Sequence, residues 1–158
     1  MTVVRTLRRK LTVTAGLALS ALLVLGIVPV RPTANAAEFG PRREMLSLTN
    51  TDRDAHDRAD LAFAAELSRY AKQHSQAMAD AGYIYHSTED EMRSAFANYN
   101  WTIGGENVGV GGTLESLEGA FMASRDHREN ILRPEFNHAA IGVARADGRV
   151  WVTVLFYG

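Results

Sequence analysis

The sequence predicts an α+β domain in which helices cover both faces of a sheet. The last segment, Val150 to Tyr157, is apolar in both of its alternating rows. Because successive side chains of a strand point to opposite faces, both faces of this strand should be covered. Asp147-Gly148 favours a two-residue turn that pairs this strand with a preceding one, Ala140 to Arg145. The helices predicted upstream are the available cover, which gives a helix–sheet–helix sandwich.

Two helices are predicted in the first half of the domain. The first runs from Arg43 to about Asp54, and the second, which has the clearest pattern, runs from the low sixties to Ala81. Asp60 is a candidate N-cap for the second helix, and Gly82 suits a left-handed C-cap. Its apolar stripe recurs at three- and four-residue steps and comprises Phe63, Leu67, Tyr70, Ala71, His74, Met78 and Ala81. On such a stripe, His74 is expected to be a hydrogen-bonded core residue.

The second half predicts shorter elements. Tyr83 to Ser87 should be extended, and a short helix should follow around Met92 and Phe96. Two glycine pairs, 104–105 and 111–112, indicate tight backbone geometry around a strand. They do not form a nucleotide-binding loop, because the lysine and the required glycine spacing are absent. A further helix presents Leu114, Leu117 and Phe121 after a Thr113 cap, and Ser124 should cap the next turn, which Pro134 closes.

Composition excludes several classes of function. There is no cysteine among the 158 residues, so a disulfide framework, a thiolate zinc site and a cysteine nucleophile are all excluded. Residues 1–36 hold five of the 17 basic residues and no acidic one, which leaves 12 basic and 18 acidic residues. The remainder therefore carries about −6, which argues against nucleic acid as the main partner.

The first 36 residues have the pattern of a secretory signal peptide. A basic segment of ten residues precedes an apolar run from Leu11 to Val28, and Ala34-Asn35-Ala36 is an A-x-A cleavage site. We expect cleavage after Ala36 or Ala37, a short leader at 37–43 and one domain at 44–158. The protein should then be secreted, with no membrane span in the mature chain and possible association with the cell envelope. An uncleaved anchor is the alternative, since the apolar run is close to the length that spans a bilayer.

Five segments of the domain carry a resemblance to a known family. They are Met45 to Arg53, which contains an N-x-x-R pattern; the helix from Leu67 to Met78 with the following Gly82 and His86-Ser87; Gly105-Glu106-Asn107-Val108; Ser124 to Leu132; and Ile141-Gly142-Val143 with the closing aromatic strand. In this order they resemble the CAP (SCP-like) superfamily of cysteine-rich secretory, venom-antigen and plant pathogenesis-related proteins. The chain is most similar to the short, cysteine-free bacterial branch, over about residues 44–157. The resemblance implies a three-layer α-β-α sandwich with a mainly antiparallel central sheet.

The resemblance also implies a groove that holds two histidines and two acidic residues. The matching positions here are His86, Glu106 and His127, while the second acidic position falls at Ser124. His86 and His127 are the candidate ligands of a divalent metal such as zinc. Glu106 is a candidate general base, a metal ligand or a buried hydrogen-bond acceptor. Ser124 is expected to be a helix cap at the edge of the groove rather than a nucleophile, because no G-x-S-x-G turn surrounds it.

The leading functional hypothesis is a secreted, monomeric and non-enzymatic module that binds a ligand in this groove. The resemblance suggests a small molecule, a lipid or sterol, a peptide or an envelope component as the ligand. The alternative is a metal-dependent hydrolase that acts on peptide or cell-wall substrate, with Glu106 activating water. The sequence supports this enzyme weakly, because a catalytic zinc site has three protein ligands and a separate base. A structural or host-interaction protein with an inert groove is the third possibility.

Overall fold

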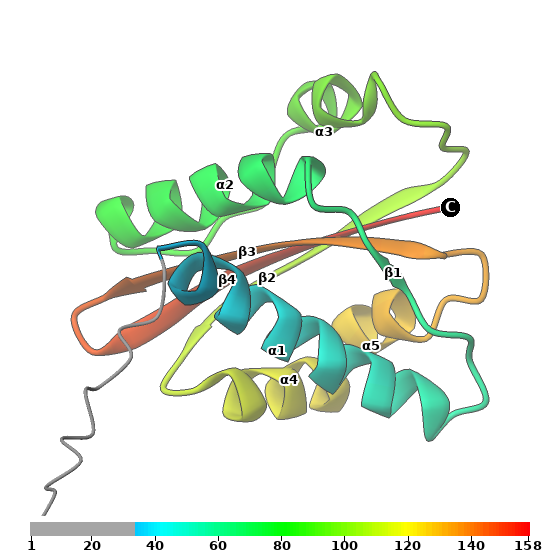
Figure 1. Cartoon of the computed structure of the whole chain (residues 1–158), viewed down its shortest axis with the longest axis horizontal. Coiled ribbons are helices and arrows are strands. Elements are labelled where there is room, and N and C mark those ends of the chain that lie inside the picture. The colour runs from blue at the N-terminus through cyan, green and yellow to red at the C-terminus, as the bar shows by residue number, and fades with distance from the viewer. Residues whose placement is uncertain (1–33) are drawn as a thin grey trace, which may run out of the picture. The chain divides into compact units, whose positions relative to one another are not determined.

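The computed structural model describes residues 34–158, in which one four-stranded sheet lies between two layers of helices (Figure 1). The strands are β1 (Ala62–Phe63), β2 (Gly104–Gly111), β3 (His138–Ala146) and β4 (Arg149–Tyr157), in the order β1-β3-β4-β2. The pairs β3–β4 and β2–β4 are antiparallel, and the short β1 is parallel to β3. The expected mainly antiparallel sheet is therefore confirmed, and β2 lies at one of its edges.

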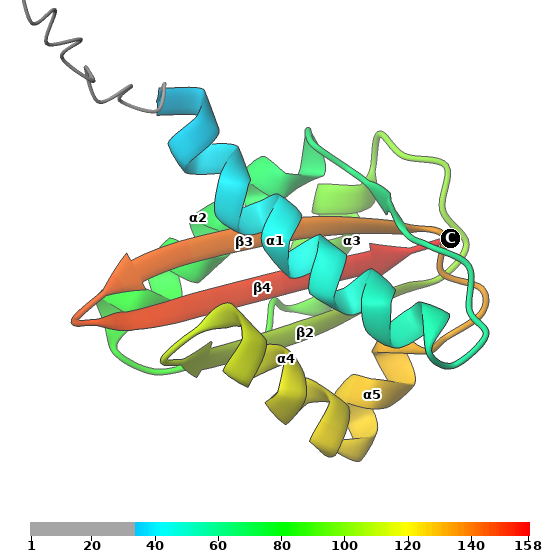
Figure 2. The same ribbon diagram turned by 60° about the horizontal axis from the view of Figure 1, so that its bottom comes forward.

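The helices divide between the two faces of the sheet. One layer contains α2 (Leu67–Ala81), which packs along β3 and β4, together with α3 (Glu89–Phe96). The other contains α1 (Ala34–Asp54), α4 (Leu114–Ala123) and α5 (Arg125–Ile131), as Figure 2 shows. This is the three-layer sandwich that the sequence predicts. Residues 1–33, which hold most of the predicted signal peptide, lie outside the described residues.

Two helices differ from their predicted bounds. The start of α2 is at Leu67, because Ala62 and Phe63 instead pair with β3 as strand β1. Asp60 is therefore not its cap, and the N-cap position is Glu66, whose side chain makes no capping hydrogen bond. The prediction that the helix begins in the low sixties was therefore wrong. Pairing of these residues with a strand far along the chain overrides their local helical periodicity. The first helix extends back to Ala34, so residues 37–43, assigned above to a leader, are helical.

Three other local predictions are confirmed. Gly82 ends α2 in the left-handed conformation with φ 77°, where a β-carbon would be strained. Thr113 caps α4 through a reciprocal pair of hydrogen bonds with Ser116. Asp147 and Gly148 both have positive φ, 50° and 70°, as a tight two-residue hairpin requires.

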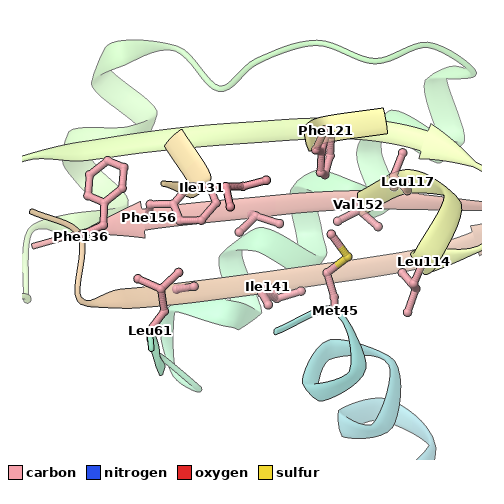
Figure 3. Packing of buried hydrophobic residues seen from close by; sticks show 12 residues of the cluster. Met45, Leu61, Leu114, Leu117, Phe121, Ile131, Phe136, Ile141, Val152 and Phe156 are labelled. Carbon is pink, nitrogen blue, oxygen red and sulfur yellow. The ribbon is translucent and has the colours of Figure 1, made fainter. Parts of the chain in front are cut away.

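Both rows of β4 are buried. Val152, Val154 and Phe156 face the layer of α1, α4 and α5, where they join a core that includes Met45, Leu117, Phe121 and Ile141 (Figure 3). Leu155 and Tyr157 face the opposite layer and pack with Leu67, Ala71 and Phe96. Because β2 and β4 are in register, residues opposite each other share a face. Glu106, opposite Leu155, therefore faces the α2–α3 layer, and Asn107, opposite Val154, faces the other layer.

The buried guanidinium of Arg53 fixes the end of α1 to the loop after α5. It donates hydrogen bonds to the carbonyl oxygens of Ile131, Arg133 and Phe136, at 2.6, 3.1 and 3.1 Å. The planar guanidinium can satisfy several carbonyls at once, which a lysine ammonium does with poorer geometry. Arg53 thus has a scaffold role.

Candidate functional site

The candidate site is centred on Glu106, in the edge strand β2. Its side chain is buried, with the whole residue 7% exposed, so the carboxylate needs hydrogen bonds to remain charged. Oε2 accepts hydrogen bonds from His86 Nδ1 at 2.8 Å and from the Ser87 backbone N–H at 3.0 Å. Oε1 accepts one from Ser87 Oγ at 2.7 Å. The loop before α3 therefore closes onto β2 through a single carboxylate.

A second polar shell surrounds this carboxylate. His74 Nε2, on α2, lies 3.8 Å from Glu106 Oε1 and 2.9 Å from the carbonyl oxygen of Tyr85. Because a carbonyl can only accept, His74 Nε2 carries a proton and donates it to Tyr85. Tyr70 Oη donates to Ser87 Oγ at 3.1 Å. His74 is thus the hydrogen-bonded core histidine that its place on the apolar stripe predicted.

The hydrogen bond to Glu106 determines which nitrogen of His86 is available. Since a carboxylate can only accept, His86 Nδ1 carries the proton, and in the neutral ring Nε2 is left as an acceptor. The side chain of His86 is 60% exposed, whereas that of Glu106 is 4% exposed. The buried acid therefore orients an imidazole that solvent and a ligand can reach.

His127 approaches from the other layer. Its ring packs edge-on against Phe121, with 4.9 Å between the ring centres. Burial lowers the pKa of His127 below its usual range, the charge of His86 lowers it further, and Asp126 partly opposes both. Since β2 is an edge strand, side chains from both layers can meet beyond it. The structure thus brings His127 within electrostatic range of His86, although the two are far apart in the sequence.

Two asparagines hold α5 against β2 at this edge. Asn107 Nδ2 donates to the carbonyl oxygen of His127 at 3.0 Å. Asn130 Nδ2 lies 2.9 Å from Asn107 Oδ1 and 3.2 Å from the carbonyl oxygen of Glu106. A β-carbon at Gly105 would lie 2.9 Å from Asn130 Oδ1, so this glycine is needed for the close approach. The asparagines position the helix that carries His127.

Ser124 is at the N-cap position of α5, but its side chain makes no capping hydrogen bond. The predicted position is right, but the predicted side-chain bond is not formed; the backbone N–H of Arg128 donates to the Ser124 carbonyl, which is the ordinary first hydrogen bond of the helix. Among the described residues no hydrogen bond joins Ser124 Oγ to His127, His86 or Glu106. The structure therefore places His86 at hydrogen-bond distance from Glu106 and His127 within electrostatic range of His86, while Ser124 is half-buried.

The donor set does not fit a metal centre as it is arranged. Within residues 34–158, no group of three or more histidine, aspartate or glutamate side chains has the geometry to hold a metal ion. His86 Nδ1 and both Glu106 oxygens are engaged with each other and with Ser87, which leaves His86 Nε2 and the ring of His127 as the remaining donors of the predicted set. A catalytic zinc site uses three protein ligands and an open position.

Ser87 links the polar cluster to a surface hollow that the sequence did not reveal. This hollow has a volume of about 380 Å³ and lies between α3 and the start of β2. Its lining residues are Ser87, Glu89, Met92, Arg93, Phe96, Trp101 and Gly104. Two other hollows, of about 410 and 500 Å³, are lined by residues 128–135 and by α1 with Asp60, and none of His86, Glu106 and His127 lines any of the three.

Glu106 and His86 should respond differently to substitution. We expect Glu106→Gln to destabilise the fold by about 1–3 kcal/mol, because three donors lose a charged acceptor. His86→Ala should change stability by less than about 0.5 kcal/mol, since the ring is largely exposed. Urea unfolding of both variants measures the difference. Equal losses for the two would contradict the division into a buried support and an accessible imidazole.

Comparison with known proteins agrees with this fold. The model of the cysteine-rich secretory protein family, CAP, matches residues 46–156. The uncharacterised protein YkwD of Bacillus subtilis is 33% identical over 116 residues, which cover 69% of this chain and 44% of YkwD. An extracellular SCP-domain protein of Bacillus anthracis superposes with a TM-score of 0.65 at 24% identity, over 82% of this chain and 44% of that one. An outer surface protein of Borrelia burgdorferi gives a TM-score of 0.58 at 19% identity, over 80% of this chain and 95% of that one.

The chain spans less than half the length of YkwD and of the Bacillus anthracis protein. Two of these solved relatives are described as extracellular or outer surface proteins. In the part of the chain that the structure describes, no helix is long and apolar enough to cross a membrane.

Proposed function

The chain belongs to the cysteine-rich secretory protein (CAP) family, and we propose that it is an exported, monomeric, non-enzymatic module that binds an amphipathic ligand. The ligand's apolar group occupies the hollow beside α3, and its polar group contacts His86. The extracellular and outer-surface relatives support export.

The observation that carries the proposal is the difference between Glu106 and His86. Glu106 is buried and both its oxygens accept hydrogen bonds, so this carboxylate is shielded from a substrate or an attacking water. His86 is exposed and held in one orientation, and its Nε2 makes no hydrogen bond within residues 34–158. A general base must reach the proton that it abstracts, which favours binding over hydrolysis.

The hollow supplies the apolar half of the ligand site. Its volume falls within the range of small-molecule sites, and Met92, Phe96 and Trp101 give it an apolar lining. Ser87 lines the hollow and also bonds to Glu106, so the apolar and polar parts are contiguous. A lipid with a polar head group suits this arrangement better than a fully polar sugar or peptide.

Tryptophan fluorescence tests the proposal with a defined probe. The chain has two tryptophans, and Trp151 is buried in another cluster, so a Trp151→Phe variant reports on Trp101 alone. We expect oleate, below its micelle concentration, to change Trp101 emission with saturation. The muramyl dipeptide N-acetylmuramyl-L-alanyl-D-isoglutamine should not change it. In the same background, His86→Ala should weaken oleate binding at least about fivefold, through loss of the hydrogen bond that His86 Nε2 donates to the oleate carboxylate when the imidazole is protonated.

Exposed Arg69, on α2, provides the control, because it lines a different hollow. Arg69→Ala should bind oleate as the parent does. No response to oleate, or the same affinity after His86→Ala, would overturn the ligand site. If one equivalent of zinc binds tightly, requires both histidines and produces peptide or cell-wall hydrolysis that a chelator abolishes, the hydrolase alternative replaces this proposal.

A further inference from the structure

Glu118, on α4, is a buried acid that the candidate site does not use. It is 3% exposed, and neither of its carboxyl oxygens has a hydrogen-bond partner among the described residues. It lies at the contact between α4 and α1, where Thr49 and Asp52 of α1 are its polar neighbours. Thr49 Oγ1 is likewise buried without a hydrogen-bond partner in the described part of the chain. An ionised carboxylate in this position is costly, whereas a neutral carboxyl can donate a proton to an oxygen nearby.

The charges around Glu118 do not offset its burial. Asp52 is the titratable neighbour from α1, and its negative charge disfavours a second carboxylate. The next residue of α1, Arg53, directs its guanidinium to carbonyl oxygens instead. One turn earlier on α4, Glu115 is exposed and interacts with Glu44 of α1, so the contact contains a second pair of acids.

The charged groups on the other elements packed against α4 are engaged elsewhere. On α5, Arg128 donates to the Met122 carbonyl oxygen, and Arg125 pairs with Glu129. On β2, Glu106 is engaged with the opposite layer. Burial first, and then the charge of Asp52, raise the pKa of Glu118 to about 7, while the Thr49 hydroxyl acts in the opposite direction.

We propose that Glu118 is a proton-controlled latch: its neutral carboxyl lets α1 pack closely on α4, and its ionisation loosens that contact. The latch is connected to the candidate site, because Arg53 of α1 holds the end of α5, the helix that carries His127. Loosening α1 therefore releases one support of the histidine at the groove.

The direction of the pH dependence follows from the two states. Where the contact is open, Glu118 is hydrated and has the ordinary carboxyl pKa of 4.5; in the closed contact the pKa is raised. The closed state therefore binds the proton more tightly and is most favoured below about pH 4.5. It weakens as the pH rises from there to about 7, and above that the effect is constant.

Hydrogen–deuterium exchange of the purified chain measures the opening of this contact. After correction for intrinsic exchange, we expect the protection of amides in residues 44–54 to fall by at least about tenfold between about pH 5 and about pH 8. Peptides from α2 should show no such fall. Glu118→Gln has the same shape without the titrating proton, and its α1 amides should keep the same protection at both pH values. This variant retains every histidine. Any effect of histidine titration on protection is therefore the same in the parent and the variant, and the difference between them reports on Glu118.

Two results would overturn the latch: no loss of protection in the parent chain, or the same loss in the Glu118→Gln variant. Should that variant not fold, a carbon-13 carboxyl titration of the parent decides the matter. The Glu118 resonance should titrate near neutral pH, and titration together with the exposed glutamates would refute the proposal. Because neither experiment uses oleate or His86, failure of the latch leaves the proposed ligand site unaffected.

Discussion

Val152→Asp and Leu155→Asp should each prevent the domain from folding stably. Both side chains are fully buried, on opposite faces of β4 and in different core clusters. A buried carboxylate without a partner costs several kcal/mol, and a domain of this size has a total stability of only about 5–15 kcal/mol. We expect loss of the cooperative thermal transition, or a fall in melting temperature of more than about 15 °C, measured by circular dichroism.

Arg145→Asp is the matched control, since it puts the same carboxylate at an exposed position on the neighbouring strand β3. It should melt within a few degrees of the parent. If either core variant melts in the same way as Arg145→Asp, that face of β4 is open to solvent and the sandwich is incorrect.

Gly142→Ala should destabilise the fold by about 3 kcal/mol or more, beyond the usual cost of overpacking. A β-carbon at this position would lie 2.0 Å from the carbonyl oxygen of Ala71 and 2.4 Å from the backbone nitrogen of Lys72. These are backbone atoms of α2, so no side-chain rotation relieves the overlap and the whole helix must move away from β3. Overpacking usually costs about 1–3 kcal/mol where side chains can adjust, and this position lacks that option. Urea unfolding measures the loss.

Two polar contacts hold α2 at this short distance and would also be lost. The backbone N–H of Ile141 donates to Ser68 Oγ at 2.9 Å, and Ser75 Oγ donates to Thr153 Oγ1 at 3.0 Å. Gly119→Ala, at an exposed position on α4, is the control, because a β-carbon there meets nothing within 4 Å. It should be neutral or stabilising by up to about 1 kcal/mol, since alanine favours helix more than glycine does. Similar stabilities for the two variants would show that α2 does not need the glycine.

Local sequence patterns predicted most of the fold but not the bounds of every helix. The Thr113 cap, the Gly82 stop and the Asp147-Gly148 turn depend on neighbouring residues, and each is found where it was expected. Strand β1 was missed because its only partner among the described residues is at His138 and Ala139, far along the chain. Two residues carry no periodicity that could distinguish a strand from the start of a helix.

The candidate site was predicted only in part. His86, Glu106 and His127 were named through the family resemblance, and the structure brings His86 and Glu106 to hydrogen-bond distance. Ser87, which gives Glu106 two of its three hydrogen bonds, was not singled out as a site residue. Its backbone N–H donates one of them. Because almost every residue has a backbone N–H, the residue type does not reveal such a donor.

The sequence alone determined the layers, because the two apolar rows of one strand and the spacing of apolar helix residues are local periodicities that burial enforces. Only the tertiary structure decided which polar groups are satisfied. Glu106 and Glu118 are both buried glutamates with the same side chain, yet one receives three hydrogen bonds and the other receives none from the described residues. That difference depends on which groups the folded chain places beside each carboxyl, and in a low-dielectric interior those neighbours determine whether the group carries charge.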